Sequence, residues 1–114
     1  MNGEINMTVK LNQAEITKRY NGIVEDILYI YENASTYDFL EFKLGMKPPK
    51  KLTEILEFLL IEKELTPSIV NALVDYAMNT NNGINKESLT ELANQCIEND
   101  VLTTEEVMEY LKTM

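Results

Sequence analysis

The 114-residue sequence contains no histidine, no tryptophan and a single cysteine, Cys96. A structural zinc site needs about four Cys or His ligands and an internal disulfide needs two cysteines, so both are excluded. Without a histidine, no serine can belong to a Ser-His-Asp triad. The four glycines form neither a G-x-x-x-x-G-K nor a G-x-G-x-x-G phosphate-binding motif. We therefore expect a protein that is not an enzyme and that uses no metal or cofactor.

Long apolar runs are also lacking. The aliphatic run from Leu59 to Ile61, preceded by Phe58, is far short of the roughly 18 apolar residues that would indicate a membrane span. The N-terminus has no basic region followed by an apolar stretch, as a secretory signal would. These absences predict a cytoplasmic protein without an integral membrane segment, and the length suits one domain with one core.

Acidic residues outnumber basic ones, with 19 Asp and Glu against 10 Lys and Arg, a formal charge of −9. Such a molecule repels nucleic acid and anionic membranes at long range, so any DNA contact must be local. The basic residues concentrate in one place, where Lys43, Lys47, Lys50 and Lys51 fall within nine positions. A helix beginning near Pro49 would add its positive N-terminal end and form a phosphate contact there. The alternative is an ordinary solvated loop.

Apolar residues recur with helical spacing over most of the chain. Spacings of four and three from Ile16 to Ile30 predict an amphipathic helix over residues 13–33, with Gly22 as a point of bending or splitting. Five further helices are expected from apolar stripes and capping signals: Ser35 to Gly45, Pro48 to about Glu64, Thr66 to Ala77, Leu89 to Ile97, and Thr103 to Leu111. The fold class is therefore all-α, a compact bundle of about five to six short helices over residues 13–114.

Residues 1–12 form a separate N-terminal arm in this interpretation. Ile5, Met7, Val9 and Leu11 alternate with polar residues, which predicts an extended strand that pairs with a partner chain or lies against the helices.

The asparagine-rich stretch between Asn79 and Asn85 was tested as a calcium loop. With Gly83 at loop position six, positions one and twelve become Met78 and Leu89, which cannot bind calcium, so a turn between helices is the better interpretation.

Three stretches resemble a known family: S-T-Y-D-F-L-E-F-K-L-G from Ser35, L-T-P-S-I-V-N-A-L-V-D-Y from Leu65 and T-T-E-E-V-M-E from Thr103. Together they are similar to the helical C-terminal domain shared by the bacterial DnaB and DnaD primosome proteins. This DnaB is the replication initiation and membrane attachment protein of low-GC Gram-positive bacteria, and the resemblance covers about residues 35–112.

The resemblance implies a DNA-binding accessory domain of a primosomal protein that helps load the replicative helicase during replication initiation or restart. Its implied partners are single-stranded or duplex DNA, bound weakly, a DnaD-like protein, the helicase loader and the replicative helicase. Family members carry winged-helix regions ahead of this domain, and residues 1–34 have no room for one. We therefore expect a fragment or a short relative, whose missing parts supply homo-oligomerisation and peripheral membrane association.

A family motif of Tyr, Ile and Trp at four-residue spacing is tied to DNA contact and aligns with Ser88, Leu92 and Cys96. Only the aliphatic member is kept, and Cys96 shares an apolar face with Leu89, which favours a core position for its thiol. The candidate DNA-contacting residues are thus these three positions together with the four clustered lysines.

Two alternatives stay open. The domain could be a protein-interaction module of the same primosome with little DNA affinity, in which acidic helical faces meet a basic partner; the acidic residues concerned are Glu98, Asp100, Glu105, Glu106 and Glu109. The other alternative is an unrelated small helical scaffold.

Overall fold

The computed structural model describes residues 11–20, 24–80 and 83–114, and every regular element in these ranges is a helix. The elements are α1 (Gln13–Arg19), α2 (Val24–Asn33), α3 (Thr36–Leu44), α4 (Lys50–Glu57), η2 (Phe58–Glu62), α5 (Pro67–Asn79), α6 (Lys86–Glu98) and α7 (Thr104–Lys112). The predicted all-α fold class is confirmed. The radius of gyration is 13.8 Å, close to the roughly 13 Å of a compact domain of this size.

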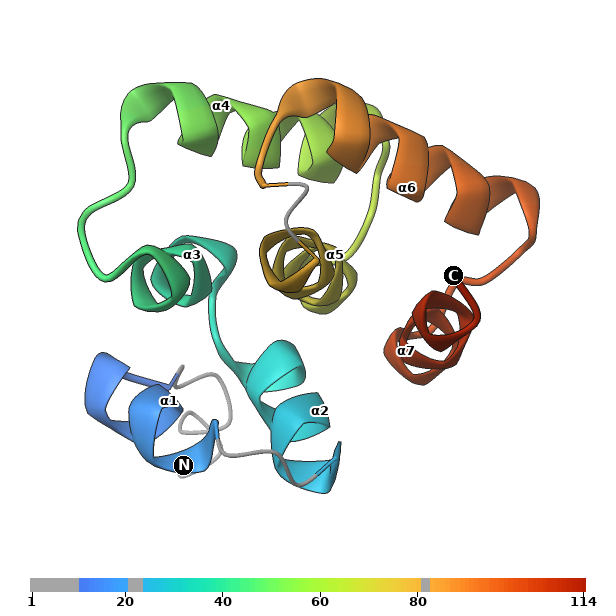
Figure 1. Cartoon of the computed structure of the whole chain (residues 1–114). Helices are drawn as coiled ribbons and strands as arrows, with labels where there is room; N and C mark the ends of the chain where they lie inside the picture. Colours follow the sequence, from blue (N-terminus) through green and yellow to red (C-terminus); the bar gives the residue numbers. More distant parts are fainter. Residues whose placement is uncertain (1–10, 21–23, 81–82) are drawn as a thin grey trace, which may run out of the picture.

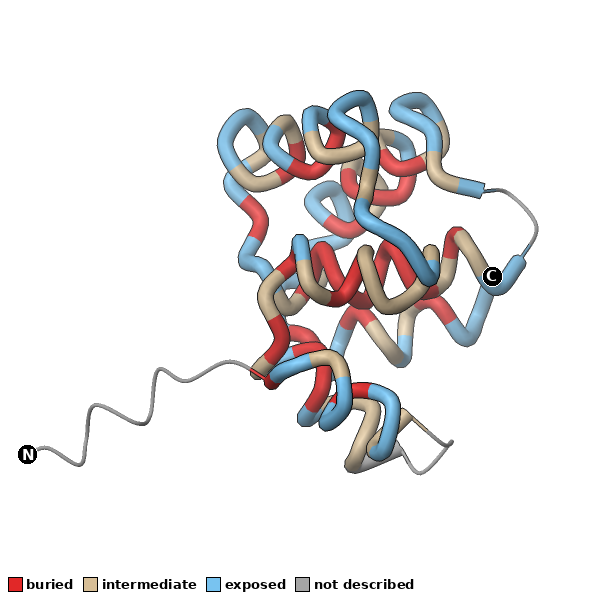
Figure 2. The backbone as a smooth tube through the Cα atoms, turned by 90° about the vertical axis from the view of Figure 1, so that its left-hand side faces the viewer, coloured by how far each residue is buried: buried red, intermediate tan, exposed pale blue. Residues whose placement is uncertain are grey.

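Helix α5 is the centre of the fold (Figure 1). It contacts α2, α3, α6, α7 and η2, and every residue from Ile69 to Asp75 is buried. A helix that is covered on all sides is apolar around most of its circumference, as the sequence of α5 is. Figure 2 shows the consequence for its neighbours, whose buried residues lie on their inner faces and whose exposed residues lie on the outside.

Most of the other helices lie in two groups on opposite sides of α5, and the remaining two flank it. The continuous rod of α4 and η2 lies with α6 above α5 in Figure 1, while α1 and α2 lie below it. Helices α3 and α7 flank α5 on its two sides. The two sides therefore present separate outer surfaces.

Several predicted helix ends are confirmed. The side-chain oxygens of Ser35 and Thr66 accept backbone amides at the starts of α3 and α5. Thr103 and Glu106 form a reciprocal capping box at the start of α7, which satisfies otherwise orphan amides. Gly45 ends α3 with φ of 73°, a left-handed conformation that favours glycine.

The helix expected over residues 13–33, with bending or splitting at Gly22, is split into two helices. Helix α1 ends at Arg19, with Tyr20 as its C-cap, and α2 begins at Val24. A straight helix over this range would extend about 30 Å, whereas the break lets α1 pack against both α2 and α3. Gly22 lies outside the described residues, so its part in this break is not described.

Most of the predicted N-terminal arm also lies outside the described residues, including Ile5, Met7 and Val9. Leu11 is described, and it is buried against the helices. Its amide donates a hydrogen bond to the carbonyl of Asn33 at 3.1 Å. This contact ties the start of the described chain to the end of α2.

The helix expected from Pro48 to about Glu64 changes its winding at Phe58. The amide of Lys63 donates to the carbonyl of Phe58 at 3.2 Å, an i to i+5 bond that defines a π-helical turn. Apolar spacing predicted the position of this helix but not its change of winding.

The amide side chain of Asn71 joins α5 to the end of α2. Asn71 is fully buried, and its Nδ2 donates to the carbonyls of Tyr31 at 3.0 Å and Ala34 at 2.9 Å. Carbonyls at a helix C-terminus lack intrahelical partners, so Asn71 satisfies two groups that would otherwise be buried unpaired.

Replacing Asn71 with Leu should lower the free energy of unfolding by about 1–3 kcal/mol, because two buried carbonyls lose their donor. The measurement is urea unfolding followed by circular dichroism. Asn94→Leu changes a half-buried α6 residue for which no hydrogen bond is found within the described chain, and it should shift stability by less than about 0.5 kcal/mol. Equal effects of the two variants would contradict this role of Asn71.

Candidate functional site

Three of the four predicted lysines lie together on the surface. Lys47 lies in the connection after α3, and Lys50 and Lys51 form the first turn of α4; all three are exposed. Their side chains form no ion pair or hydrogen bond with any residue that the structure describes. Pro49 is the N-cap of α4, and it has no side-chain cap hydrogen bond. The exposed lysines therefore surround a helix N-terminus that no side chain caps.

Lys43 is not part of this surface, because its side chain points into the protein. Only 11% of that side chain is exposed, and Nζ lies 2.7 Å from Oδ1 of Asp75. The ammonium group also donates to the hydroxyl of Tyr20 and to Oδ1 of Asn79, each at 3.0 Å. The prediction of a four-lysine phosphate contact is corrected here, since Lys43 neutralises a buried carboxylate.

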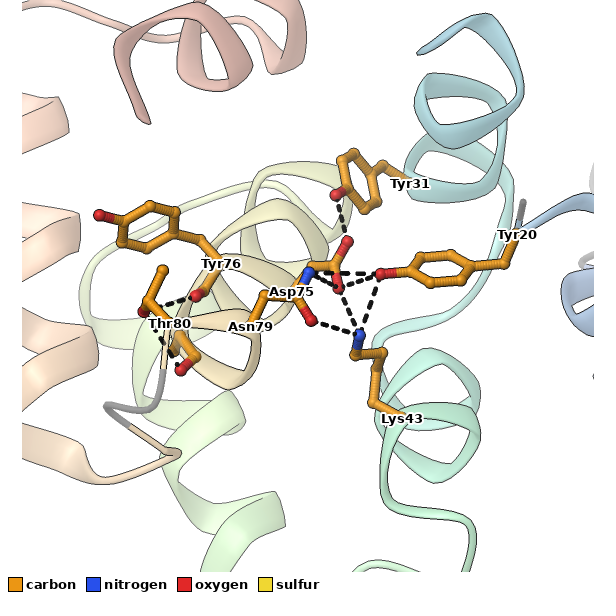
Figure 3. Close-up of polar contacts among 8 residues, drawn as sticks. Tyr20, Tyr31, Lys43, Asp75, Tyr76, Asn79 and Thr80 are labelled. Carbon is orange, nitrogen blue, oxygen red and sulfur yellow. Dashed lines mark hydrogen bonds and ion pairs between the residues drawn. The ribbon is translucent and has the colours of Figure 1, made fainter. Parts of the chain in front are cut away.

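The carboxylate of Asp75 gathers side chains from four helices (Figure 3). The Tyr20 hydroxyl at the end of α1 donates to Oδ1 at 2.6 Å, and the Tyr31 hydroxyl from α2 donates to Oδ2 at 2.5 Å. Lys43 reaches Oδ1 from α3, and Asn79 donates to it from the next turn of α5. We call Tyr20, Tyr31, Lys43, Asp75 and Asn79 the Asp75 cluster.

Burial and hydrogen bonding set the protonation of this cluster. Burial, followed by the negative charge of Asp75, holds the pKa of the Tyr31 hydroxyl well above its usual value. Burial alone would lower the pKa of Lys43, but its hydrogen bonds to Asp75 and Tyr20 outweigh burial and raise that pKa. The Tyr31 hydroxyl is therefore neutral and the Lys43 side chain is an ammonium ion near neutral pH.

An apolar cavity of about 370 Å³ adjoins the Asp75 cluster, bounded by α1, α2, α5 and α7. Its walls include Ile27, Met108 and Leu111. Both oxygens of Asp75 are already occupied by donors from the protein, so no free polar group is directed into the cavity by this residue. The Asp75 cluster fits a structural role, because its charged groups satisfy one another.

The three residues aligned with the family motif have different environments on α6. Leu92 and Cys96 are buried, with Cys96 at 0% exposure, and burial raises the pKa of its thiol. The core interpretation of Cys96 is therefore confirmed. Ser88 is half-buried. Cys96 cannot contact DNA in this conformation because it is fully buried, whereas Leu92 is 8% exposed and lines a surface hollow together with Ser88.

The acidic residues of the interaction alternative separate into two places. Asp100, Glu105, Glu106 and Glu109 line one shallow depression at the start of α7, whereas Glu98 lines a different groove beside η2. Glu106 also accepts the amides of the loop before α7. Four of the five acidic residues of the interaction alternative thus lie together at α7, and Glu98 does not lie with them.

Within the described ranges, no group of three or more Cys, Asp or Glu side chains is placed to hold a metal ion. No helix among the same residues is long and apolar enough to cross a membrane.

Sequence patterns did not identify the Asp75 cluster. The one sequence signal for this cluster was a charged residue within an apolar stretch. Asp75 directly follows Val74 and lies two residues before Ala77, and all three are buried in α5. Its partners are 32 or more positions away along the chain, apart from Asn79, so no local spacing could identify them.

Comparisons with protein-family models, curated proteins and solved structures found no match for this chain. The resemblance to the DnaB and DnaD domain stays a prediction that rests on the residues quoted above.

Lys43→Met should destabilise the protein by about 3–5 kcal/mol, because it leaves the buried carboxylate of Asp75 without its cation. Lys47→Met is the control, because Lys47 is exposed and lies four residues further along the chain. It should lower the free energy of unfolding by less than about 0.5 kcal/mol. Urea unfolding of both variants checks the difference. Adding Asp75→Leu to Lys43→Met should restore part of the loss, and an equal, small effect of the two single variants would rule out the buried pair as a major contribution.

Stability should fall on the alkaline side. The folded-state pKa values of Tyr31 and Lys43 are raised, so their contribution is fully present below the unfolded values of about 10 and is lost as the pH rises above them. Urea midpoints at about pH 9 and pH 11 measure this loss. Tyr31→Phe should reduce the difference between the two midpoints.

The control for that experiment is Tyr37→Phe, because Tyr37 is 41% exposed. It should show the same alkaline loss as the parent. An alkaline loss that is unchanged in Tyr31→Phe would show that Tyr31 does not titrate differently in the two states.

Proposed function

We propose that this chain is a DNA-binding accessory domain of a primosomal protein that helps load the replicative helicase. In this proposal it contacts DNA through Lys47, Lys50 and Lys51 and has no catalytic role. Its protein partners are a DnaD-like protein, the helicase loader and the replicative helicase. The observation that carries the proposal is the exposure of three unpaired lysines around the uncapped N-terminus of α4.

The local chemistry at this N-terminus suits a phosphate group. The first amides of a helix have no intrahelical acceptor, and the helix dipole places partial positive charge there. The first turn of α4 contains no acidic residue, so nothing there opposes the lysines. Contacts of this kind hold the nucleic acid backbone and do not read base sequence.

The remainder of the surface limits the affinity. The formal charge of −9 repels DNA at a distance, and the removal of Lys43 from the basic cluster leaves three cations instead of four. We therefore expect weak binding that depends strongly on salt concentration and does not distinguish sequences.

A protein-interaction module is the second candidate function. It is favoured by the depression at α7, where Asp100, Glu105 and Glu109 gather carboxylates around one hollow of about 520 Å³. Such a surface attracts a basic partner, and binding there would not depend on the lysines of α4.

Fluorescence anisotropy with labelled single-stranded and duplex DNA tests the proposal at low and near-physiological salt. Changing Lys47, Lys50 and Lys51 to Ala should weaken binding and reduce the slope of log affinity against log salt by about 2.7 on duplex DNA, if each lysine neutralises one phosphate. The matched control changes Lys18, Lys63 and Lys112 to Ala, which removes the same charge elsewhere. The control should keep most of the slope.

Equal losses in the two triple variants would contradict a localised DNA contact, because they would reflect net charge alone. No binding by the folded parent at low salt would overturn the proposal and favour the second candidate.

A further inference from the structure

A groove lies between Phe58 of η2 and α6, on the side of the domain that carries neither α1 nor α2 (Figure 1). It has a volume of about 620 Å³, and its walls are the half-buried ring of Phe58 and one face of α6. Lys86 lies over that ring, with Nζ 4.4 Å from its centroid. The groove is therefore open along α6 and has an aromatic surface on its other side.

The backbone beside the groove is unusual. Phe58 is the first residue of the π-helical turn, whose i to i+5 bond joins Phe58 and Lys63. Turns of this kind are rare and recur at functional sites. Here the change of winding begins at the residue whose ring lines the groove.

The α6 wall is acidic. Glu87, Glu91 and Glu98 all line the groove, at positions i, i+4 and i+11, which share one face of a helix. No described residue forms an ion pair with any of these three carboxylates. Lys86 is the one cation among the described lining residues, so the groove carries an excess of negative charge.

We propose that the groove between η2 and α6 binds a basic amphipathic helix of a partner protein. The apolar side of that helix packs on Phe58 by displacing the ammonium groups of Lys86 and Lys63, which lie over its ring. The lysines or arginines of the partner helix meet Glu87, Glu91 and Glu98. Helix α6 has 13 residues and is about 20 Å long, so three to four turns of the partner span the groove. This surface is separate from the lysines of α4, and the inference does not depend on DNA binding.

Charge complementarity selects this occupant. The groove is acidic, and the apolar area at Phe58 gives a helix with one apolar face a defined place to pack. DNA is excluded from this surface by repulsion from the three carboxylates. A second copy of this chain would bring its own acidic groove, so pairing of two grooves face to face is disfavoured.

The test uses a fluorescein-labelled amphipathic peptide of leucine, alanine and lysine, about 14 residues long to match α6, with a scrambled peptide of the same composition beside it. The full chain should bind the amphipathic peptide more tightly than the scrambled one. Glu87→Lys with Glu91→Lys should weaken that binding by about tenfold, because two attractive contacts become repulsive.

The matched control is Glu54→Lys with Glu57→Lys on α4, an exposed pair at i and i+3 that lines neither the groove nor the α7 depression. It changes the net charge equally, so it measures the non-specific part of the attraction and should lower affinity less than about threefold. Phe58→Ala should also weaken peptide binding, provided that circular dichroism shows the variant to be folded. If it is not folded, the comparison of the two double Glu→Lys variants alone tests the proposal.

Equal losses in the α6 and α4 pairs, or equal binding of the two peptides, would overturn the proposal. So would sedimentation showing that the parent forms a dimer which Glu87→Lys with Glu91→Lys abolishes, because the groove would then be an interface between copies of the chain. Unchanged peptide affinity in a folded Phe58→Ala variant would overturn the aromatic contact and with it the proposed orientation of the helix.

Discussion

The burial of Asp75 is the constraint on which the rest of the structure depends. A carboxylate in the interior is costly unless it is paired and hydrogen-bonded, and α5 places this one at 3% exposure. Its partners come from the end of α1, from α2 and from α3. Satisfying one carboxylate therefore positions three N-terminal helices on the central helix. The same requirement removes Lys43 from the basic surface, so it does not contribute to the proposed DNA contact.

Local signals in the sequence determined much of the fold. Thr66 followed by Pro67 marks the start of α5, and Thr103 with Glu106 marks the start of α7, because capping depends on residues three positions apart. Gly45 marks the end of α3 for the same local reason. A split of the 13–33 helix near Gly22 was one of the two outcomes predicted there, and α1 and α2 lie on either side of it. The π-helical turn at Phe58 was not predicted, since apolar spacing does not distinguish the two windings.

The candidate sites were less accessible to prediction from the sequence. Spacing placed Cys96 on the apolar face of its helix, and the structure confirms its burial. Spacing also grouped Lys43 with three neighbouring lysines, but only the fold shows that Lys43 points inward while Lys47, Lys50 and Lys51 point to solvent. The groove beside Phe58 needed the structure too, because its two walls are about 30 positions apart in the chain. Periodicity predicts which face of a helix is buried but does not predict which exposed faces meet.

The resulting molecule separates its charges along one side. The rod of α4 and η2 begins with exposed lysines, and its far end forms a wall of an acidic groove with α6. Lys51 and Phe58 are about 10 Å apart along this rod, so DNA and a basic protein segment are proposed to bind to neighbouring, oppositely charged places. In this proposal an acidic domain contacts DNA locally while it attracts a basic partner.

The most direct test of this account is an NMR titration of the ¹⁵N-labelled protein with a short single-stranded oligonucleotide at low salt. The account predicts that amide shifts change chiefly from Lys47 through Thr53, at the start of α4, and change little in α6 and α7. Shift changes centred on α6, or no changes in a protein with a folded spectrum, would contradict it.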